Sequence, residues 1–364
     1  MSADLDGLRV LMMAGGTGGH VFPALAVARA LGTRGAIVEW LGTAAGIEAR
    51  LVPAEGITLH TIRVAGLRGK HLTTLLAAPM AITRALWEAR GVLRRVRPHV
   101  VVGMGGFAAG PGGVMARLGG MPLVIHEQNA AAGLTNRILA RLARRTLQAF
   151  PGTFAARHGA VTVGNPVRAE ILALAPPATR WAERHGPLRL LVLGGSGGAL
   201  AINQRVPEAL AGLADAERPQ VWHQAGKTLE AAETAYAERG VAGRVEAFID
   251  DMAAAYAWAD VVICRSGALT VAELAAAGVG ALLVPYPHAV DDHQAANGAY
   301  LVDAGAARLV RQNEFTADRL REELVALGGD RPALLTRAEA ARAAAWPEST
   351  DRIVEACIQA REAT

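Results

Sequence analysis

The 364-residue sequence contains few cysteines, few aromatic residues and almost no net charge. Its two cysteines, Cys264 and Cys357, are too few for a disulfide framework or a four-ligand zinc site, which favours a reducing compartment. The 37 Lys and Arg residues exceed the 33 Asp and Glu residues by only four, which excludes a general nucleic-acid binder. The length predicts about two domains, each large enough to bury its own core.

Long hydrophobic runs are also missing. Residues Met1–Gly7 are polar and acidic, so they do not predict a signal peptide. The longest uncharged stretch of the first half, Pro98–Ala116, contains six glycines and two prolines and is a poor candidate for a transmembrane helix. We therefore expect a soluble protein, or one attached at most to a membrane surface.

Glycine, in contrast, is abundant, with 41 residues. Short apolar runs alternate with amphipathic segments of helical length, a pattern typical of parallel sheets wound with helices. Strands are predicted at residues 8–14, 36–41, 58–64, 100–103, 123–126, 146–150, 188–193, 220–224, 245–249, 261–264, 281–285 and 307–310. Helices are predicted at residues 23–31, 134–142, 199–210, 229–239, 269–277 and 349–363, the last with Ser349 or Thr350 as N-cap.

One pattern occurs twice. The apolar run at residues 8–14 leads into Gly15–Gly19, and the run at residues 188–193 leads into Gly194–Gly198. Each copy is expected to open its own α/β domain. The prediction is two Rossmann-like doubly wound domains, residues 1–164 and 165–345, facing a cleft that holds the site. A C-terminal helix at about 346–364 is expected to pack back on the first domain.

A glycine-rich turn between a strand and a helix presents backbone N–H groups and the helix dipole to an anion, and a diphosphate fits best. Thr17 and Ser196 add a hydroxyl to each turn. The alternative is that the glycines only permit tight turns, and the second copy favours ligand binding. Val21 and Leu200 stand where a nicotinamide-binding motif needs its third glycine, and neither turn carries a Walker lysine. Both facts argue against a dehydrogenase or an ATPase.

Polar residues follow several predicted strands at the edge where α/β sheets bind ligands. His20 is a candidate general base, or alternatively a residue that starts a helix and binds the loop backbone. Glu273, placed in a first helical turn, is predicted to bind sugar hydroxyls or else to cap its helix. The clusters at 126–129 and 291–294 lack the spacing of metal ligands, so no metal is assigned. Cys264 lies in an apolar run and is interpreted as a core residue.

These motifs together resemble the MurG family of peptidoglycan glycosyltransferases. Eight blocks carry the resemblance in order along the chain: Gly15–His20, Gly105–Phe107, His126–Asn129, Gly164–Arg168, Gly194–Gly198, Phe248–Met252, Arg265–Glu273 and Asp291–Gln294. The resemblance implies a two-domain GT-B fold and an inverting transfer of GlcNAc from UDP-GlcNAc to lipid I, giving lipid II. It implies neither a cofactor nor a metal.

The resemblance also implies roles for individual residues. The donor is expected to meet Ile249 and Arg168 at the uracil and Glu273 at the ribose, with Ser196 and backbone N–H groups of Ala268, Leu269, Thr270 and Val271 at the phosphates. Further expected contacts are Gln294 and Asn129 with GlcNAc, and Thr17, Gly18 and Gly19 with the diphosphate. His20 is the expected base, and Glu127 is a second catalytic candidate. Phe107 stands where many relatives carry tyrosine.

A lipid acceptor requires a membrane-facing surface. Between Arg63 and Arg97, eight basic residues stand against one acidic residue, Glu88, among several large apolar side chains. This segment is predicted to bind an anionic membrane surface, or alternatively to be a helix that packs on the first sheet. The expected location is peripheral, on the cytoplasmic face of the bacterial inner membrane. Cell-wall or division proteins are expected as partners, and nucleic acid is not.

Two other functions stay open from the sequence. A UDP-GlcNAc 2-epimerase or another GT-B transferase would share the donor chemistry but not the acceptor. A non-catalytic subunit that binds a nucleotide sugar would belong to a different class, although it would not need the base that His20 offers.

Overall fold

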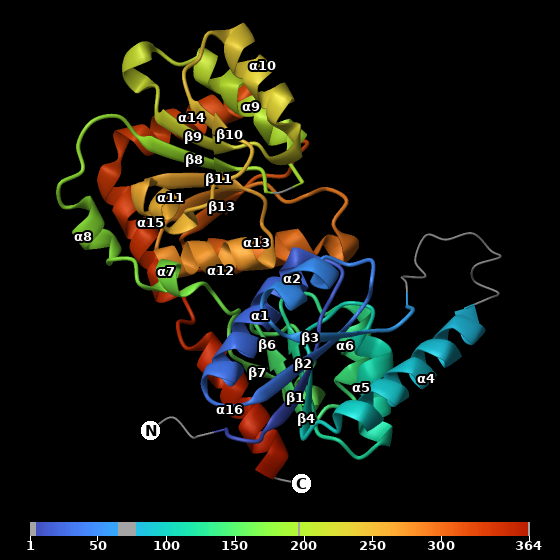
Figure 1. The fold of residues 1–364 in the computed structure, drawn as a ribbon. Helices are drawn as coiled ribbons and strands as arrows, with labels where there is room; N and C mark the ends of the chain where they lie inside the picture. The colour runs from blue at the N-terminus through green and yellow to red at the C-terminus, as the bar shows by residue number, and fades with distance from the viewer. Residues whose placement is uncertain (1–4, 65–77, 196, 363–364) are drawn as a thin grey trace. The chain divides into compact units, whose positions relative to one another are not determined.

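The computed structural model describes residues 5–64, 78–195 and 197–362. The chain divides into two compact units (Figure 1). Unit 1 comprises Met1–Pro166 together with Pro347–Thr364, and unit 2 comprises Val167–Trp346.

Unit 1 is built on a parallel sheet. In the described part of the unit the sheet has seven strands in the order β3-β2-β1-β4-β5-β6-β7. The strands are β1 (Arg9–Met13), β2 (Ile37–Gly42), β3 (Thr58–Thr61), β4 (Val100–Gly103), β5 (Leu123–Glu127), β6 (Arg145–Gln148) and β7 (Val161–Thr162). The described helices are α1 (Gly18–Thr33), α2 (Glu48–Ala54), α4 (Ala78–Val96), α5 (Ala109–Leu118), α6 (Leu134–Leu139), the 3₁₀ helix η1 (Ala156–His158) and α16 (Ser349–Glu362).

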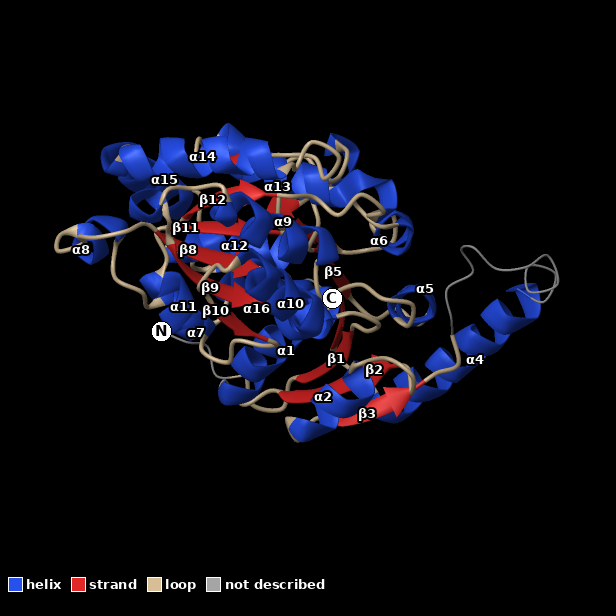
Figure 2. Ribbon diagram, turned by 90° about the horizontal axis from the view of Figure 1, so that it is seen from above, coloured by secondary structure: helices blue, strands red, loops and turns tan. Residues whose placement is uncertain are grey.

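Alternation along the strands gives this sheet two apolar faces, because successive side chains point to opposite sides. Val10 and Met12 of β1 pack in one cluster with buried residues of α1 and α16. Leu11 and Met13 pack in the opposite cluster with buried residues of α4, α5 and α6. The strands therefore lie between two helical layers, as Figure 2 shows.

Unit 2 repeats this architecture. Its described sheet has six parallel strands in the order β10-β9-β8-β11-β12-β13. The strands are β8 (Arg189–Leu193), β9 (Gln220–Gln224), β10 (Arg244–Glu246), β11 (Val261–Cys264), β12 (Gly280–Leu283) and β13 (Ala307–Leu309). The α-helices are α7 (Ala169–Leu172), α8 (Pro177–Trp181), α9 (Leu200–Ala211), α10 (Leu229–Arg239), α11 (Met252–Trp258), α12 (Ala268–Ala277), α13 (His293–Asp303), α14 (Ala317–Gly329) and α15 (Arg331–Ala343). The 3₁₀ helices are η2 (Asp215–Glu217), η3 (Gly226–Thr228) and η4 (Val290–Asp292).

The two sheets confirm the prediction of two doubly wound α/β domains. In each, the strand order reverses next to the strand that leads into a glycine-rich turn, β1 in unit 1 and β8 in unit 2. Ligands of open α/β sheets bind outside the carboxyl ends of the strands at this point of reversal. The repeated sequence pattern thus lies at the corresponding point of both units.

Some predicted element boundaries were wrong. The helix predicted from Pro23 begins at Gly18, because packing of this turn overrides the low helix propensity of glycine. Strand β7 was missed, since two residues show no periodicity. Helix α16 begins at Ser349, so Ser349 and Thr350 are helical residues and not N-caps. Among the described residues, no helix is long and apolar enough to cross a membrane.

Candidate functional site

The first glycine-rich turn joins β1 to α1. Gly16 has a φ of +86°, a left-handed conformation that favours glycine. Thr17 is the N-cap of α1, and its carbonyl accepts a hydrogen bond from the His20 N–H at 3.1 Å. The N–H groups of Gly18 and Gly19 belong to the first turn, where a helix offers no acceptor, so they can donate to an anion.

The His20 ring is tied to this turn. Its Nδ1 lies 3.3 Å from the carbonyl oxygen of Gly15 and 3.3 Å from Oγ1 of Thr17. A carbonyl only accepts, so Nδ1 carries the proton in that contact and Nε2 of the neutral ring keeps its lone pair. The contact fits both interpretations of His20, because it binds the loop backbone and also selects the nitrogen that can act as a base.

A second turn, between β4 and α5, packs directly on the first. Gly105 and Gly106 have φ values of +94° and +86°. A Cβ atom on Gly105 would lie 2.5 Å from Cδ2 and 2.8 Å from Nε2 of His20. A Cβ atom on Gly106 would lie 2.5 Å from the carbonyl oxygen of Gly15. Only glycine therefore fits at either position, and the exposed Phe107 follows them directly.

The Glu127 carboxylate at the end of β5 is enclosed by its own loop. Its Oε1 accepts hydrogen bonds from the backbone N–H and from Nδ2 of Asn129, at 3.0 and 3.2 Å. Its Oε2 accepts from the N–H of Gly133 at 3.1 Å and from Nδ2 of Asn136 at 2.9 Å. These four donors surround a side chain that is 2% exposed. The geometry favours a role in orienting Asn129 over a role in proton transfer.

The second glycine-rich turn, between β8 and α9, rests on two polar side chains, the buried Asn203 and the half-buried Thr228. Gly195 and Gly198 have left-handed φ values of +72° and +78°, and Ser196 between them lies outside the described residues. Asn203 of α9 donates from Nδ2 to Oγ1 of Thr228 at 2.8 Å, and a Cβ atom on Gly198 would lie 2.3 Å from that same hydroxyl. Asn203 and Thr228 thus support the turn from beneath.

Arg168 and Glu273, far apart in sequence, form an ion pair in unit 2. The guanidinium donates to Oε1 of Glu273 at 2.9 and 3.2 Å, and the buried Tyr256 hydroxyl donates to Oε2 at 3.1 Å. Burial raises the pKa of Glu273 despite the opposing effect of Arg168. Burial also raises the pKa of Tyr256 well above its usual value, so its hydroxyl stays protonated as a donor.

The placement of Glu273 in a first helical turn was wrong. Helix α12 begins at Ala268, so Glu273 lies in the second turn, and its carboxylate accepts from Arg168 and Tyr256 instead of capping the helix. The N–H of Val271 donates to the carbonyl of Gly267 at 2.9 Å, so it is already used within the helix. The N–H groups at positions 268–270 precede this first intrahelical bond and can donate to a phosphate.

The two remaining donor-site candidates have defined surroundings. The side chain of Ile249 is 2% exposed, which fits a contact made through its backbone, and the neighbouring Phe248 is 60% exposed. Gln294 accepts through Oε1 from the N–H of Tyr286 at 2.8 Å, which directs its Nε2 group to donate elsewhere. Asp292, two residues before Gln294, has a φ of +49° and forms a two-point ion pair with Arg311.

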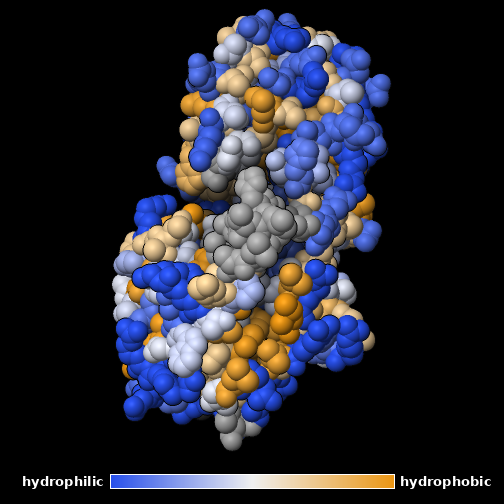
Figure 3. Space-filling view, turned by 90° about the vertical axis from the view of Figure 1, so that its right-hand side faces the viewer, coloured by the Kyte–Doolittle hydropathy of each residue, from blue (hydrophilic) through white to orange (hydrophobic). Residues whose placement is uncertain are grey.

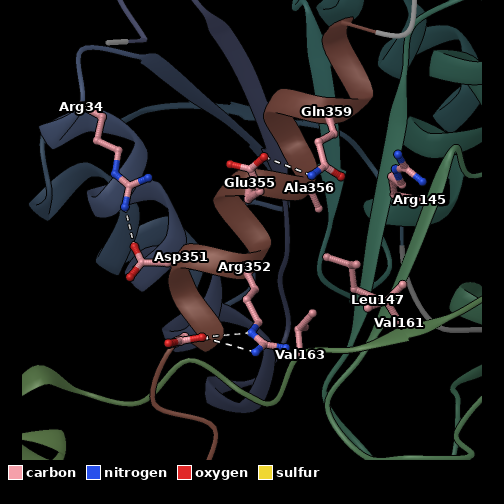
Figure 4. A pocket seen from close by; sticks show the side chains of 11 residues that line it. Arg34, Arg145, Leu147, Val161, Val163, Asp351, Arg352, Glu355, Ala356 and Gln359 are labelled. Carbon is pink, nitrogen blue, oxygen red and sulfur yellow. Dashed lines mark hydrogen bonds and ion pairs between the residues drawn. The ribbon is translucent and has the colours of Figure 1, made fainter. Parts of the chain in front are cut away.

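Other features of the described residues offer no comparable chemistry. No group of three His, Cys, Asp or Glu side chains there is arranged to hold a metal. Burial raises the pKa of the Cys264 thiol to about 12, which suits a core residue and not a nucleophile. A cavity of about 510 Å³ lies in unit 1 between α16 and the β6–β7 end of the sheet (Figure 4). Among the residues that line this cavity, Arg352 pairs with Glu348 and Asp351 pairs with Arg34. None of the predicted site residues lines the cavity.

The structure brings some predicted residues together and adds others. It joins His20 to Thr17 and Glu127 to Asn129 in unit 1, and Arg168 to Glu273 in unit 2. Sequence reasoning missed three buried partners: Glu48, Asn203 and Tyr256. No local pattern marks them, because each acts on a residue of a different element.

The comparisons agree with this architecture. Residues 10–148 match the glycosyltransferase family 28 N-terminal domain, and residues 189–353 match the family's C-terminal domain. A protein of Marinobacter nauticus named UDP-N-acetylglucosamine–N-acetylmuramyl-(pentapeptide) pyrophosphoryl-undecaprenol N-acetylglucosamine transferase is 57% identical over 97% of both chains. The crystal structure of Acinetobacter baumannii MurG matches with a TM-score of 0.85 and 42% identity, over 97% of this chain and 99% of that one.

A more distant neighbour shares the fold alone. The UDP-GlcNAc 2-epimerase of Neisseria meningitidis matches with a TM-score of 0.66 at 12% identity, over 97% of this chain and all of that one. The two domain matches and the 57% identity, together with two parallel sheets of the GT-B type, establish that this chain belongs to glycosyltransferase family 28.

Proposed function

We propose that this protein transfers GlcNAc from UDP-GlcNAc to the C4 hydroxyl of MurNAc in lipid I, undecaprenyl-diphospho-MurNAc-pentapeptide, to give lipid II. The observation that carries the proposal is the 57% identity, over 97% of both chains, with a transferase named for this reaction. The glycine-rich turns at the two points of strand reversal support it, since both can bind a diphosphate.

Unit 2 is the proposed donor-binding unit. Glu273 binds the ribose hydroxyls. Each of its oxygens has two acceptor sites; Arg168 fills both sites of Oε1, and Tyr256 fills one site of Oε2, so the second site of Oε2 can accept from a hydroxyl while both pairs persist. The uracil binds at the Ile249 backbone, near Arg168. The phosphates bind at Ser196 and at the N–H groups of positions 268–270, and Gln294 donates from Nε2 to GlcNAc.

Unit 1 is the proposed acceptor unit. The MurNAc C4 hydroxyl attacks C1 of GlcNAc as the bond from C1 to the UDP oxygen breaks, and this single displacement inverts the anomeric centre. Nε2 of His20 takes the hydroxyl proton. Backbone N–H groups at residues 17–19 and at the start of α12 stabilise the negative charge that develops on UDP. Asn129, held by Glu127, donates to GlcNAc.

Helix α4 is the proposed membrane contact, at the cytoplasmic face of the inner membrane. The helix exposes Met80 (78%), Ile82 (47%) and Trp87 (65%). Four exposed arginines accompany them, at positions 84, 90, 94 and 95. Figure 3 shows hydrophobic side chains gathered beside hydrophilic ones on this side of unit 1. Exposed apolar side chains flanked by basic ones suit a bilayer surface that carries anionic lipids.

A radiolabel experiment separates this function from its two alternatives. The protein is incubated with UDP-[¹⁴C]GlcNAc with and without lipid I, and the lipid and sugar products are resolved. Label in lipid II supports the proposal. Epimerised or hydrolysed sugar that forms without lipid I would favour an epimerase, and tight donor binding without turnover would favour a non-catalytic subunit.

The variant His20→Ala tests the proposed base. We expect kcat to fall by about 10²–10⁴-fold, the usual contribution of a general base, with a nearly unchanged KM for UDP-GlcNAc. His158→Ala, which alters a half-buried histidine of η1 in the same unit, is the matched control. A kcat equal to that of the unaltered protein would remove His20 from the mechanism.

A further inference from the structure

A buried carboxylate lies beneath the first glycine-rich turn. Glu48 is the first residue of α2, and its side chain is fully buried. Its Oε2 accepts a hydrogen bond from the N–H of Gly16 at 2.9 Å. Its Oε1 accepts from the N–H and from Oγ1 of Thr43, at 3.0 and 2.8 Å. An ionised carboxylate buried in this way has to be matched by donors, and three surround it.

The surrounding backbone leaves room for this side chain only because three positions are glycine. A Cβ atom would lie 2.4 Å from Oε1 of Glu48 if placed on Gly15 and 2.0 Å from Oε2 if placed on Gly46. A Cβ atom on Gly42 would lie 2.8 Å from the Cγ of Glu48. The β1–α1 turn and the β2–α2 connection therefore both close around one carboxylate.

A single peptide group links this carboxylate to His20. The Gly16 N–H that Glu48 binds and the Gly15 carbonyl that His20 Nδ1 contacts belong to the same planar unit. No described peptide bond is cis, so this N–H and this carbonyl point in opposite directions. Fixing the N–H thus fixes the carbonyl, and a charged acceptor on one side strengthens the hydrogen bond on the other.

We propose that Glu48 is a positioning residue that holds the Gly15–Gly16 peptide group and, through its carbonyl, holds His20 with Nε2 as the basic nitrogen. The functional part of this inference rests on the proposed role of His20 as base. Burial acts to raise the pKa of Glu48, but the hydrogen bonds from Gly16 and Thr43 outweigh it, and the pKa lies below its usual value. The carboxylate is therefore ionised at neutral pH and can accept all three bonds.

The variant Glu48→Gln tests the proposal with little change in shape. An amide has one acceptor oxygen, so an NH₂ group must face either Gly16 or the Thr43 pair, and one of these donors loses its acceptor. We expect kcat to fall by about 10- to 100-fold, as expected for a misplaced reacting group, with little change in the KM for UDP-GlcNAc. Glu55→Gln is the matched control, since Glu55 directly follows α2 and pairs with Arg29 away from the turn.

A readout independent of catalysis is the tautomer of His20. Nitrogen NMR of ¹⁵N-histidine-labelled protein should show Nδ1 protonated in the neutral ring, with the His20 signal assigned by its loss in His20→Ala. In Glu48→Gln the two tautomers should become mixed, whereas Glu55→Gln should match the unaltered protein. If Glu48→Gln does not fold, Glu48→Asp keeps the charge but cannot reach both donors, and it should show the same mixture.

The outcomes separate a positioning role from a structural one. An unchanged tautomer, with activity lost only in proportion to the unfolded fraction, would overturn the proposal. A changed tautomer with reduced kcat in folded protein would support it. A changed tautomer in a protein whose unaltered form transfers no GlcNAc would support the Glu48 contact and refute the proposed function.

Discussion

At the residue scale, the position of Glu273 depends on two neighbours distant in sequence. Tyr256 lies 17 residues before it and Arg168 lies 105 residues before it, and their side chains bind different oxygens of the carboxylate. The Tyr256 ring is fully buried, so its hydroxyl has a fixed direction. Tyr256 is therefore placed to set the orientation in which Glu273 would meet a ribose.

The variant Tyr256→Phe removes this hydroxyl and keeps the ring. We expect the KM for UDP-GlcNAc to rise about tenfold, because a hydrogen bond to a charged group contributes about 1.5–3 kcal/mol and part of it is recovered by other donors. The kcat should change little. Tyr300→Phe, which removes a hydroxyl bonded to the Ala344 carbonyl, is the control. An unchanged KM in Tyr256→Phe would show that Glu273 does not need this contact.

The sequence predicts a functional residue when a local motif marks it, and misses a residue whose contacts lie far away in the chain. The sequence predicts His20 and Asn129 as site residues, because each directly follows a strand-and-turn pattern at the ligand-binding edge of a sheet, and their roles stay predictions. Glu48 was not, because it contacts Gly16 from 32 positions away and nothing near it in sequence indicates that contact. Long-range contacts of this kind exist only once the sheet has formed.

At the element scale, helix α4 has two different apolar surfaces. Ala85, Ala89 and Val92 are buried on the sheet, while Met80 and Trp87 are exposed. The buried face confirms the interpretation of this segment as a helix that packs on the first sheet, whereas binding of the exposed face to a membrane stays a prediction. Part of the predicted membrane segment, residues 65–77, lies outside the described residues.

The double variant Arg94→Glu with Arg95→Glu tests the outer face of α4. Each basic residue near an anionic surface contributes about 1 kcal/mol, so reversing both should weaken vesicle binding at least tenfold. Cosedimentation with phosphatidylglycerol vesicles measures the effect, with phosphatidylcholine vesicles for comparison. Arg319→Glu with Arg321→Glu in α14 is the control, and binding unaffected by the α4 variant would rule out this contact.

At the scale of the whole molecule, each unit contains a buried neutral histidine. His126 in unit 1 and His223 in unit 2 are fully buried, and burial lowers the pKa of each to about 4. His126 binds the Gly164 carbonyl, and His223 contacts Asn203 and the Tyr236 hydroxyl. The neutral ring is therefore part of the folded core in both units.

This burial predicts acid sensitivity. Between pH 6.5 and pH 4 the unfolded chain binds a proton at each histidine and the folded chain does not, so stability falls as the pH falls. Each histidine should remove about 2 kcal/mol of unfolding free energy between pH 7 and pH 5. Urea unfolding at the two pH values measures this loss. In His223→Gln the loss of unfolding free energy between the two pH values should be smaller by about 2 kcal/mol, the contribution of one histidine. A loss as large as in the unaltered protein would contradict the conclusion that the buried His223 causes part of the acid sensitivity.

The sequence alone determined the class of the fold, the two glycine-rich turns and the family, because these depend on local periodicity and on motifs that are contiguous in the chain. The tertiary structure decided which side chains support those motifs. Glu48 binds the first turn, Asn203 supports the second, and Tyr256 binds Glu273. These contacts depend on strand order and burial, which bring together residues that are distant in the sequence. The tertiary structure also decided at which residue α1 and α12 begin, because packing sets where a helix begins. The first residue of each helix determines which N–H groups can bind a phosphate.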